Sequence, residues 1–298
     1  MALLPDLDEL VALRGAAHGL DMRLRHPAAA QLQGGHRSAH RGRGLEFDEV
    51  RPYVQGDDAR TIDWRVTARR GRPHTKLFRE ERERVVWLLA DLHPGLYFGS
   101  RQQLKSALLL RAAAWLAWVT VSAGDRLGAV LTRGTELPQL LPPRSRDIGA
   151  LAVLQALVQS QPRAPGVSAA GGLGVALSTL RPLLRSGSTV VVLSDFSDLD
   201  AATQTALATV AMRAECRLLW LTDVLEHDGL PSGTFRVGLP GQLWSLDGAT
   251  SRTAWAARWA QRQQRIDDLS RSHRVPVLRL DTSGDLAQTL PRFLSESR

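Results

Sequence analysis

The amino-acid sequence predicts an α/β protein built on a doubly wound, mostly parallel sheet. The first observation is that, from Val85 onward, short β-branched or Leu-rich runs alternate with longer Ala/Leu-rich segments. Strands that alternate with helices form parallel sheets whose two faces are both covered. The second is that 298 residues with 44% hydrophobic content can bury a large core. We therefore expect a sheet domain over residues 84–298 and an N-terminal extension over residues 1–83.

The elements in the first half of this domain follow from the length and composition of each run. Short apolar runs indicate buried strands, and longer runs rich in Ala and Leu indicate helices. An Asp often caps the N-terminus of a helix, and a Gly often ends it. In order, we expect a strand at 84–92, a helix at 101–124, a strand at 125–133, a Pro/Arg-rich loop at 136–146 and a helix at 147–160.

The same alternation continues after a probable linker at 161–172, which is rich in Pro, Gly and Ala. The expected elements are a helix at 173–187 that bends or ends near Pro182, a strand at 188–196, a helix at 201–215, a strand at 216–224, an amphipathic helix at 253–273 and a strand at 275–281. The alternation of strands and helices thus continues to residue 281, as expected for a doubly wound sheet.

Residues 1–83 lack this alternation. A helix is expected at 6–18, and a Gly/Arg/His-rich stretch at 33–44 leads into a segment, 44–64, that carries six carboxylates and two arginines among large apolar residues. The apolar residues of this segment follow neither the period of a strand nor that of a helix. We therefore expect a turn-rich extension that packs on the sheet domain.

The cysteine and hydropathy content favours the cytoplasm. Cys216 is the only cysteine, so an internal disulfide and a Cys-rich metal site are excluded. The most apolar window, 106–125, is interrupted by Arg111, and its apolar stretches are too short to span a bilayer. The N-terminus has early acids and no basic flank before an apolar segment, which argues against a signal peptide. We expect a cytoplasmic protein without a membrane span.

The positive charge is concentrated near the N-terminus. Of a formal net charge of +8, residues 23–84 hold an excess of six, from fifteen Lys/Arg and nine Asp/Glu. A basic face could steer nucleic acid or an acidic protein partner. Because the acids are interspersed among the bases, an ordinary solvated surface explains the pattern equally well. Nucleic-acid binding by the arginine-rich segment 37–84 is therefore kept as an alternative hypothesis.

The segment 44–64 has two structural explanations. Its aromatic residues could anchor a half-buried network in which carboxylates and guanidinium groups satisfy each other. Alternatively, the Gly and Asp residues of "QGDDAR" form a turn, and carboxylates cap a short helix within 59–70. Either explanation makes the segment a structural brace.

The order of residues in this region is distinctive. The residues concerned are Arg51, Tyr53, Gly56, Asp57, Arg60, Asp63, Trp64, Ala68, Arg69, Lys76 and Glu81. Because of these residues, the sequence from Gly34 to Ser100 resembles the signature region of the domain-of-unknown-function 58 family (DUF58). The resemblance continues in three later segments: "LK" at 104–105, "GDRLG" at 124–128 and the late strand "VVVLSDFSD". The resemblance implies a von Willebrand factor A-like domain, a Rossmann-like α/β fold, over residues 84–298.

The resemblance also implies an interaction role. Members of this family are similar in organisation to partners of MoxR-type AAA+ ATPases, with whose genes theirs are often clustered, and they are thought to help chaperone-like maturation of other proteins. This implies a non-enzymatic adaptor whose signature residues either brace the fold or dock the ATPase. The signature residues are Arg51, Tyr53, Asp57, Asp58, Arg60, Asp63, Trp64 and Arg69. The sequence does not identify the client protein.

A von Willebrand factor A domain commonly holds Mg²⁺ at the carboxyl ends of its strands, through an Asp-x-Ser-x-Ser motif, a Thr and a later Asp. In this sequence Asp91 is present, but His93 and Gly95 stand where the serines would be. Leu173 takes the place of the Thr, and Asp195 is the other match. We therefore expect a degenerate site and no cofactor. Two carboxylates and a histidine could still hold a softer ion such as Zn²⁺ or Mn²⁺.

Motifs of the common catalytic classes are absent from the sequence. It contains no nucleophile elbow, no phosphate loop and no His-Glu-x-x-His helix. Cys216 and His273 lie in an apolar strand and at a helix end, which is typical of a core thiol and a surface imidazole. We predict that the protein is not an enzyme. Hydrolysis at a metal held by Asp91, His93 and Asp195 is a further hypothesis from a different class.

Overall fold

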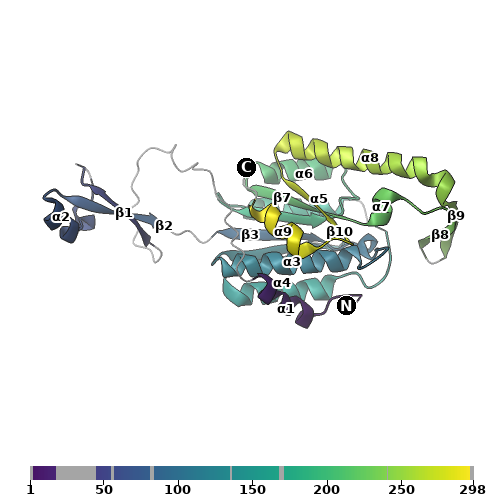
Figure 1. Ribbon diagram of the computed structural model, residues 1–298, viewed down its shortest axis with the longest axis horizontal. Coiled ribbons are helices and arrows are strands. Elements are labelled where there is room, and N and C mark those ends of the chain that lie inside the picture. Colours follow the sequence, from purple (N-terminus) through teal and green to yellow (C-terminus); the bar gives the residue numbers. More distant parts are fainter. Residues whose placement is uncertain are drawn as a thin grey trace. The chain divides into compact units, whose positions relative to one another are not determined.

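The computed structural model of the chain describes residues 3–17, 45–54, 57–80, 84–134, 136–167, 171–239 and 241–295. The chain divides into two compact units (Figure 1). The larger, which we call the sheet domain, comprises Met1–Arg25 and Arg84–Arg298, and the smaller, which we call the small unit, comprises His26–Glu83.

A sheet of six described strands forms the centre of the sheet domain (Figure 1). The strands lie in the order β10-β7-β6-β3-β4-β5; β5 runs antiparallel to β4, and the other neighbouring pairs are parallel. Their bounds are β3 Val85–Asp91, β4 Arg126–Thr132, β5 Gln139–Arg144, β6 Thr189–Ser194, β7 Glu215–Thr222 and β10 Val277–Asp281. This arrangement confirms the predicted doubly wound, mostly parallel α/β fold.

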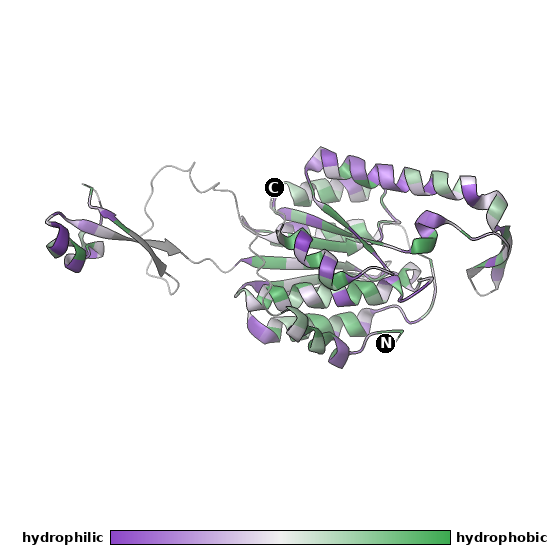
Figure 2. Cartoon of the chain, viewed as in Figure 1, coloured by the Kyte–Doolittle hydropathy of each residue, from purple (hydrophilic) through white to green (hydrophobic). Residues whose placement is uncertain are grey.

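The central strands are continuous apolar runs because both faces of the sheet are covered. In β3, Leu88 and Ala90 belong to one buried apolar cluster, whereas Trp87 and Leu89 belong to another. Successive side chains of a strand point to opposite faces, so each cluster lies on one side of the sheet. The strong apolar character of these strands is visible in Figure 2.

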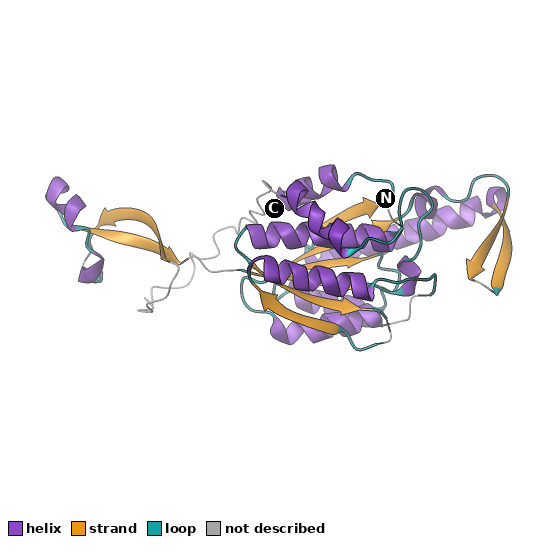
Figure 3. Ribbon diagram, turned by 90° about the horizontal axis from the view of Figure 1, so that it is seen from below, coloured by secondary structure: helices purple, strands orange, loops and turns teal. Residues whose placement is uncertain are grey.

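Helices cover the two faces of the sheet in two layers (Figures 1 and 3). On the face of Leu88 the core includes α1 Leu7–Ala17, α3 Lys105–Ser122, α4 Arg146–Ser160 and α9 Leu286–Ser295. On the face of Trp87 it includes α5 Gly172–Leu180, α6 Ala201–Ala211 and α8 Gly248–His273. Among the helices that the structure describes, none has the length and apolar character needed to cross a membrane.

The N-terminal helix belongs to the sheet domain, whereas we predicted it as part of an extension ending at residue 83. Leu10 is fully buried, and the Trp118 indole Nε1 donates to the Leu10 backbone oxygen at 3.0 Å. The Arg111 Nε lies 2.7 Å from the Glu9 carboxylate. These contacts hold α1 on α3, so this helix is part of the sheet domain.

Two further regions differ from the sequence prediction. The predicted loop at 136–146 contains β5, whose consecutive prolines, Pro142 and Pro143, are tolerated because β5 is the edge strand. The region after β7 contains unpredicted elements: the short helix α7 Val224–Asp228 and a hairpin of β8 Thr234–Leu239 and β9 Gln242–Asp247. The helix α9 was also not predicted.

The small unit is built on a pair of antiparallel strands, β1 Leu45–Pro52 and β2 His74–Glu80. The connection between them carries the 3₁₀ turn Ala59–Thr61 and the helix α2 Trp64–Arg70. The Asp63 amide donates to the His74 carbonyl at 2.8 Å, which ties the start of α2 to β2. The Gly/Arg/His-rich stretch at 33–44, Gly56 and Glu81 lie outside the described residues.

Candidate functional site

The carboxyl ends of β3 and β6 meet at the point where the sheet changes direction. The chain continues from β3 to β4 toward one edge and from β6 to β7 toward the other. Open α/β sheets bind ligands at this switch point. Asp91 ends β3, Ser194 ends β6, and Asp195 directly follows β6. The Ser194 hydroxyl donates to the Asp91 carboxylate at 2.7 Å, so the two predicted aspartates do lie in one buried site.

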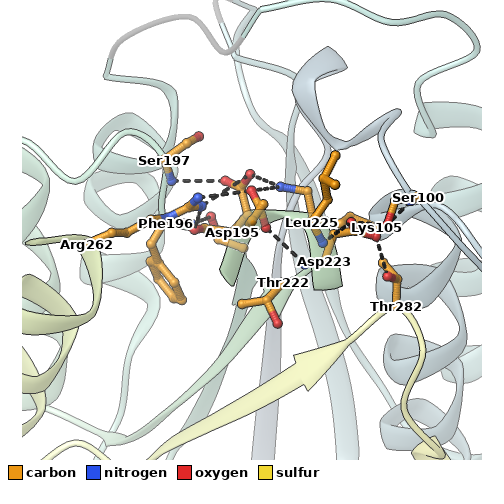
Figure 4. Close-up of polar contacts among 12 residues, drawn as sticks. Ser100, Lys105, Asp195, Phe196, Ser197, Thr222, Asp223, Leu225, Arg262 and Thr282 are labelled. Carbon is orange, nitrogen blue, oxygen red and sulfur yellow. Dashed lines mark hydrogen bonds and ion pairs between the residues drawn. The ribbon is translucent and has the colours of Figure 1, made fainter. Parts of the chain in front are cut away.

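A cluster of buried and half-buried ion pairs surrounds Asp195 (Figure 4). We call it the ion cluster, and it consists of His93, Lys105, Asp195, Glu226 and Arg262. The Lys105 ammonium lies 2.6 Å from Asp195 Oδ2 and 3.0 Å from Glu226 Oε1. His93 Nε2 lies 3.2 Å from Asp195 Oδ1.

Arg262, on α8, closes the ion cluster from the other side of Asp195 (Figure 4). Its Nη1 lies 3.1 Å from Glu226 Oε1, and its Nη2 lies 3.5 Å from Asp195 Oδ2 and donates to the Asp195 backbone oxygen. Each carboxylate is therefore shared between Lys105 and Arg262. The two cations and two carboxylates cancel in formal charge.

The position of Lys105 in the sequence does not by itself explain its burial. It is the first residue of α3, where the positive end of the helix dipole disfavours an ammonium group. Its amide donates to the Phe98 carbonyl at 2.7 Å, and only 2% of the residue is exposed. The two carboxylates compensate for both the helix dipole and the loss of water around the ammonium.

The pKa values of Lys105 and Asp195 are shifted in the directions that keep both side chains charged. Burial alone would raise the pKa of Asp195, but the Lys105 ammonium and the hydrogen bond to His93 hold the pKa of Asp195 well below its usual value. Burial would lower the pKa of Lys105, yet Asp195 and Glu226 raise it. Lys105 and Asp195 are therefore an ammonium and a carboxylate near neutral pH.

Asp91 and His93 titrate differently. Burial raises the pKa of Asp91 to about 6, although the nearby His93 and the hydrogen bond from Ser194 oppose this rise. Burial disfavours the imidazolium form of His93, but the hydrogen bond to Asp195 and the charge of Asp91 raise its pKa. Asp91, whose carboxyl group binds a proton at about pH 6, thus lies beside the paired charges of Lys105 and Asp195.

A second buried carboxylate, Asp223, fixes the loop after β7. It accepts hydrogen bonds from the Ser100 hydroxyl and the Thr282 hydroxyl, both at 2.5 Å, and from the Leu225 amide at 2.9 Å (Figure 4). Burial would raise the pKa of Asp223, but the bonds from Ser100 and Thr282 lower it. The Asp223 amide also donates to Glu226 Oε2, which links this carboxylate to the ion cluster.

The charged side chains of the ion cluster are paired with one another. Every carboxylate of the ion cluster is paired, and no nucleophile among the described residues faces a free base within it. Burial raises the pKa of the Cys216 thiol to about 12, so this core thiol is not a nucleophile near neutral pH. The arrangement instead ties α3, α8 and the loops after β3, β6 and β7 into one rigid face.

The residues at this edge do not fit the Mg²⁺ site that the fold implies. Mg²⁺ requires about six oxygen ligands in near-octahedral geometry, but Leu173 is packed in an apolar cluster and the Lys105 ammonium already contacts Asp195. Across the part of the chain that the structure describes, no three His, Cys, Asp or Glu side chains are grouped to hold a metal ion. Asp91, His93 and Asp195 do not form such a group, so they do not fit the softer ion considered above either.

Adding Mg²⁺ or removing divalent ions with EDTA is expected to leave the thermal unfolding midpoint unchanged. An ion present at about 100 times its dissociation constant would stabilise the fold by about 2.7 kcal/mol, which corresponds to several degrees. The measurement is thermal unfolding followed by circular dichroism, with NaCl at equal ionic strength as the control. A rise specific to Mg²⁺ would contradict the assignment of the positive charge at this site to Lys105.

In the small unit, the predicted signature carboxylates mainly bind backbone amides. Asp58 accepts from the Arg60 amide and begins the 3₁₀ turn, while Asp63 accepts from the Arg65 and Val66 amides and begins α2. Asp57 lies 2.9 Å from the Arg51 guanidinium. The explanation in which carboxylates cap a turn and a short helix thus accounts for Asp58 and Asp63, whereas Asp57 forms the carboxylate–guanidinium pair of the other explanation.

Other signature residues face solvent. Trp64 is 71% exposed, although we considered the aromatics of this segment as anchors of a buried network. Arg60 and Arg69 are exposed, and among the described residues neither has an acidic partner. Tyr53 differs, since its hydroxyl donates to the Asp57 carbonyl at 3.1 Å. The signature therefore consists of two groups: residues whose contacts stabilise the local fold, and residues whose side chains are exposed to solvent.

Three members of the ion cluster were not predicted from the sequence as site residues: Lys105, Glu226 and Arg262. Lys105 was noted within "LK" only as part of a family resemblance. Glu226 and Arg262 are more than 100 residues distant from Lys105 in sequence. Glu226 forms a capping box with Asp223 at the start of α7, but this local pattern does not point to Asp195. Only the packing of α7 and α8 onto the sheet brings them to Asp195.

Comparison with known proteins agrees with the family resemblance. Residues 49–265 match the family described as "Protein of unknown function DUF58". The uncharacterized protein Rv1480 of Mycobacterium tuberculosis is 32% identical over 191 residues, which cover 64% of this chain and 59% of the relative. The uncharacterized protein Mb1516 of Mycobacterium bovis matches to the same extent. The chain thus spans 59% of the length of these curated relatives.

Among solved structures, similarity is found to BatB from Bacteroides thetaiotaomicron, with 13% identity, a TM-score of 0.45 and coverage of 71% of this chain and 97% of that one. An aerotolerance-related membrane protein from Bacteroides fragilis gives 15% identity, a TM-score of 0.46 and coverage of 71% and 98%. A von Willebrand factor type A protein from Catenulispora acidiphila gives 16% identity, a TM-score of 0.35 and coverage of 50% and 34%. Because the family match covers more than half of the sequence and includes the signature residues 51–69 and the strands β3 to β7, this chain belongs to the DUF58 family.

Proposed function

We propose that this chain is a non-enzymatic interaction module that works as an adaptor for a MoxR-type AAA+ ATPase in the cytoplasm, in the maturation or assembly of other proteins. The observation that carries the proposal is the division of the signature in the small unit. Its carboxylates stabilise the local fold, whereas Trp64, Arg60 and Arg69 are exposed. If the signature only stabilised the fold, its tryptophan would be expected to be buried, so the exposure of Trp64 points to a partner.

The chemistry of this exposed group suits a protein partner. Trp64 and Arg65 begin α2, and Arg69 lies four residues after Arg65 on the same helix face. Tryptophan and arginine are the residue types most enriched among those that dominate binding energy at interfaces. The complementary surface of the ATPase would be acidic, with an apolar pocket for the indole. The ion cluster supports the same role, because it stabilises a scaffold and offers no catalytic group.

The experiment is a pull-down of the tagged chain from extract of its native cells, with ATP and with a non-hydrolysable analogue, followed by mass spectrometry for a MoxR-type ATPase. Analytical ultracentrifugation of the purified pair then measures affinity. Trp64→Ala is expected to weaken association at least tenfold, as for an interface hot spot, and Arg60→Ala and Arg69→Ala are expected to weaken it less. All variants must retain the wild-type circular dichroism spectrum and melting behaviour.

Trp244→Ala is the matched control, since Trp244 is 60% exposed on the hairpin strand β9. It is expected to bind as the wild type does. If the purified pair does not associate in any nucleotide state, or if Trp64→Ala and Trp244→Ala bind equally well, docking through α2 is wrong. Recovery of nucleic acid instead, with affinity that falls steeply with salt, would favour the alternative function of the arginine-rich segment 37–84.

A further inference from the structure

A small cavity lies beside the ion cluster, between α8 and the loop that follows β6. Its volume is about 180 Å³, and its lining residues are Phe196, Ser197, Leu199, Arg258, Gln261, Arg262, Arg265 and Ile266. Sites for drug-sized ligands usually have volumes of about 300–1,000 Å³. The cavity therefore suits a small group, or one functional group of a larger ligand.

The charge of this cavity is strongly positive. Three of its lining residues are arginines from α8, and no acidic residue lines it. Arg262 is paired with Asp195 and Glu226, but among the described residues neither Arg258 nor Arg265 has an ion-pair partner. Of the acids in the loop after β6, Asp195 is paired with Lys105 and Arg262, and Asp198 accepts a hydrogen bond from the Gly171 amide.

The spacing of the arginines has an energetic cost. Arg258, Arg262 and Arg265 follow one another at intervals of four and three residues, so they share a helix face. Like charges at these spacings repel and destabilise a helix. Glu226 and Asp195 offset the charge of Arg262 only. An anion in the cavity would offset the other two.

The opposite wall of the cavity is held in a fixed conformation. Phe196 has a φ of 51°, in the left-handed region that bulky residues seldom adopt. Its amide donates to the Ser194 hydroxyl, and the Ser197 amide donates to Asp195 Oδ1, both at 2.9 Å. The hydrogen bonds to Ser194 and Asp195 thus maintain this strained turn, and Ser197 lines the cavity together with the arginines of α8. Figure 4 shows Ser197 and Arg262 on either side of the turn at Phe196. A wall that is fixed before binding reduces the entropy lost by a ligand.

We propose that this cavity binds a phosphate-type oxyanion, either free phosphate or the phosphate group of a small metabolite. A guanidinium group presents paired donors that match phosphate oxygens. Phosphate carries close to two negative charges and three strongly accepting oxygens, which match two unpaired arginines and the donors of Ser197 and Gln261 better than a single carboxylate does. Arg262 connects the bound anion to the ion cluster. The proposal does not depend on docking through the small unit.

Isothermal titration of the full chain with inorganic phosphate, in low-salt buffer near neutral pH, tests this site. We expect saturable binding that Arg258→Gln and Arg265→Gln each weaken by about tenfold, because each removes charge-assisted hydrogen bonds. Arg252→Gln is the matched control: it removes the same charge from an exposed position of α8 outside the cavity. It is expected to change the affinity by less than about twofold.

AMP and ATP distinguish the two sources of phosphate. Tighter binding of a nucleotide than of inorganic phosphate, with the same loss in Arg258→Gln, assigns the site to a phosphorylated metabolite, and the reverse order assigns it to free phosphate. Three results would overturn the proposal: no phosphate binding at low salt, equal losses in Arg252→Gln and Arg258→Gln, or acetate bound as tightly as phosphate.

Discussion

Replacement of Lys105 by methionine is expected to lower the free energy of unfolding of the sheet domain by about 3–5 kcal/mol, the usual cost of removing one partner from a buried ion pair. Methionine retains most of the volume of lysine, so the loss comes from charge rather than from a cavity. Asp195 and Glu226 would share only Arg262 and His93 as cationic partners. In a domain of this size the midpoint of thermal unfolding should fall by about 6–20 °C.

The measurement is urea unfolding followed by circular dichroism, with Arg271→Met as the control. The Arg271 side chain is 69% exposed and pairs with Asp268 at the surface, so its removal should change the unfolding free energy by less than about 0.5 kcal/mol. Asp195→Asn combined with Lys105→Met should lose less than the two single variants together, because the double variant leaves fewer unpaired charges. A loss below about 1 kcal/mol in Lys105→Met would mean that the ammonium does not stabilise this edge of the sheet.

The sheet was predictable because burial on both faces imposes a visible pattern. In β3 and β6 almost every residue must be apolar, and such runs alternate with helical segments along the chain. Elements under weaker constraint were missed. β5 lies at the edge, is partly exposed, and contains two prolines that usually indicate a loop. The hairpin of β8 and β9 is largely exposed, so its sequence carries little signal of burial.

The partner of the N-terminal helix was not predictable either. Its apolar residues, such as Leu10, show that one face is buried but not against which unit. The answer depends on Trp118 and Arg111, which lie more than 100 residues later. The same limit applies to the ion cluster, because the sequence does not show whether a lysine at the start of a helix is buried or exposed. The caps of Asp58 and Asp63 could be foreseen because they are local.

Asp91→Asn is expected to stabilise the sheet domain in a pH-dependent manner, because it removes a carboxyl group that the fold forces to ionise against burial. The pKa of Asp91 is raised from 3.8 to about 6 in the folded chain. The folded state therefore binds this proton more tightly than the unfolded state does. The native carboxyl costs little below about pH 4, and its cost grows as the pH rises through 6, reaching about 3 kcal/mol above pH 7.

An asparagine at this position has no such titration and can still accept the hydrogen bond from Ser194. The gain in unfolding free energy of Asp91→Asn over the wild type should thus be larger at about pH 8 than at about pH 5, by roughly 1–1.5 kcal/mol. Thermal unfolding at the two pH values measures the difference. The control, Asp267→Asn, changes an exposed carboxylate on α8 and should show no such dependence. A gain that is equal at both pH values would show that Asp91 titrates as an ordinary carboxyl, and that the edge of β3 is more hydrated than its burial indicates.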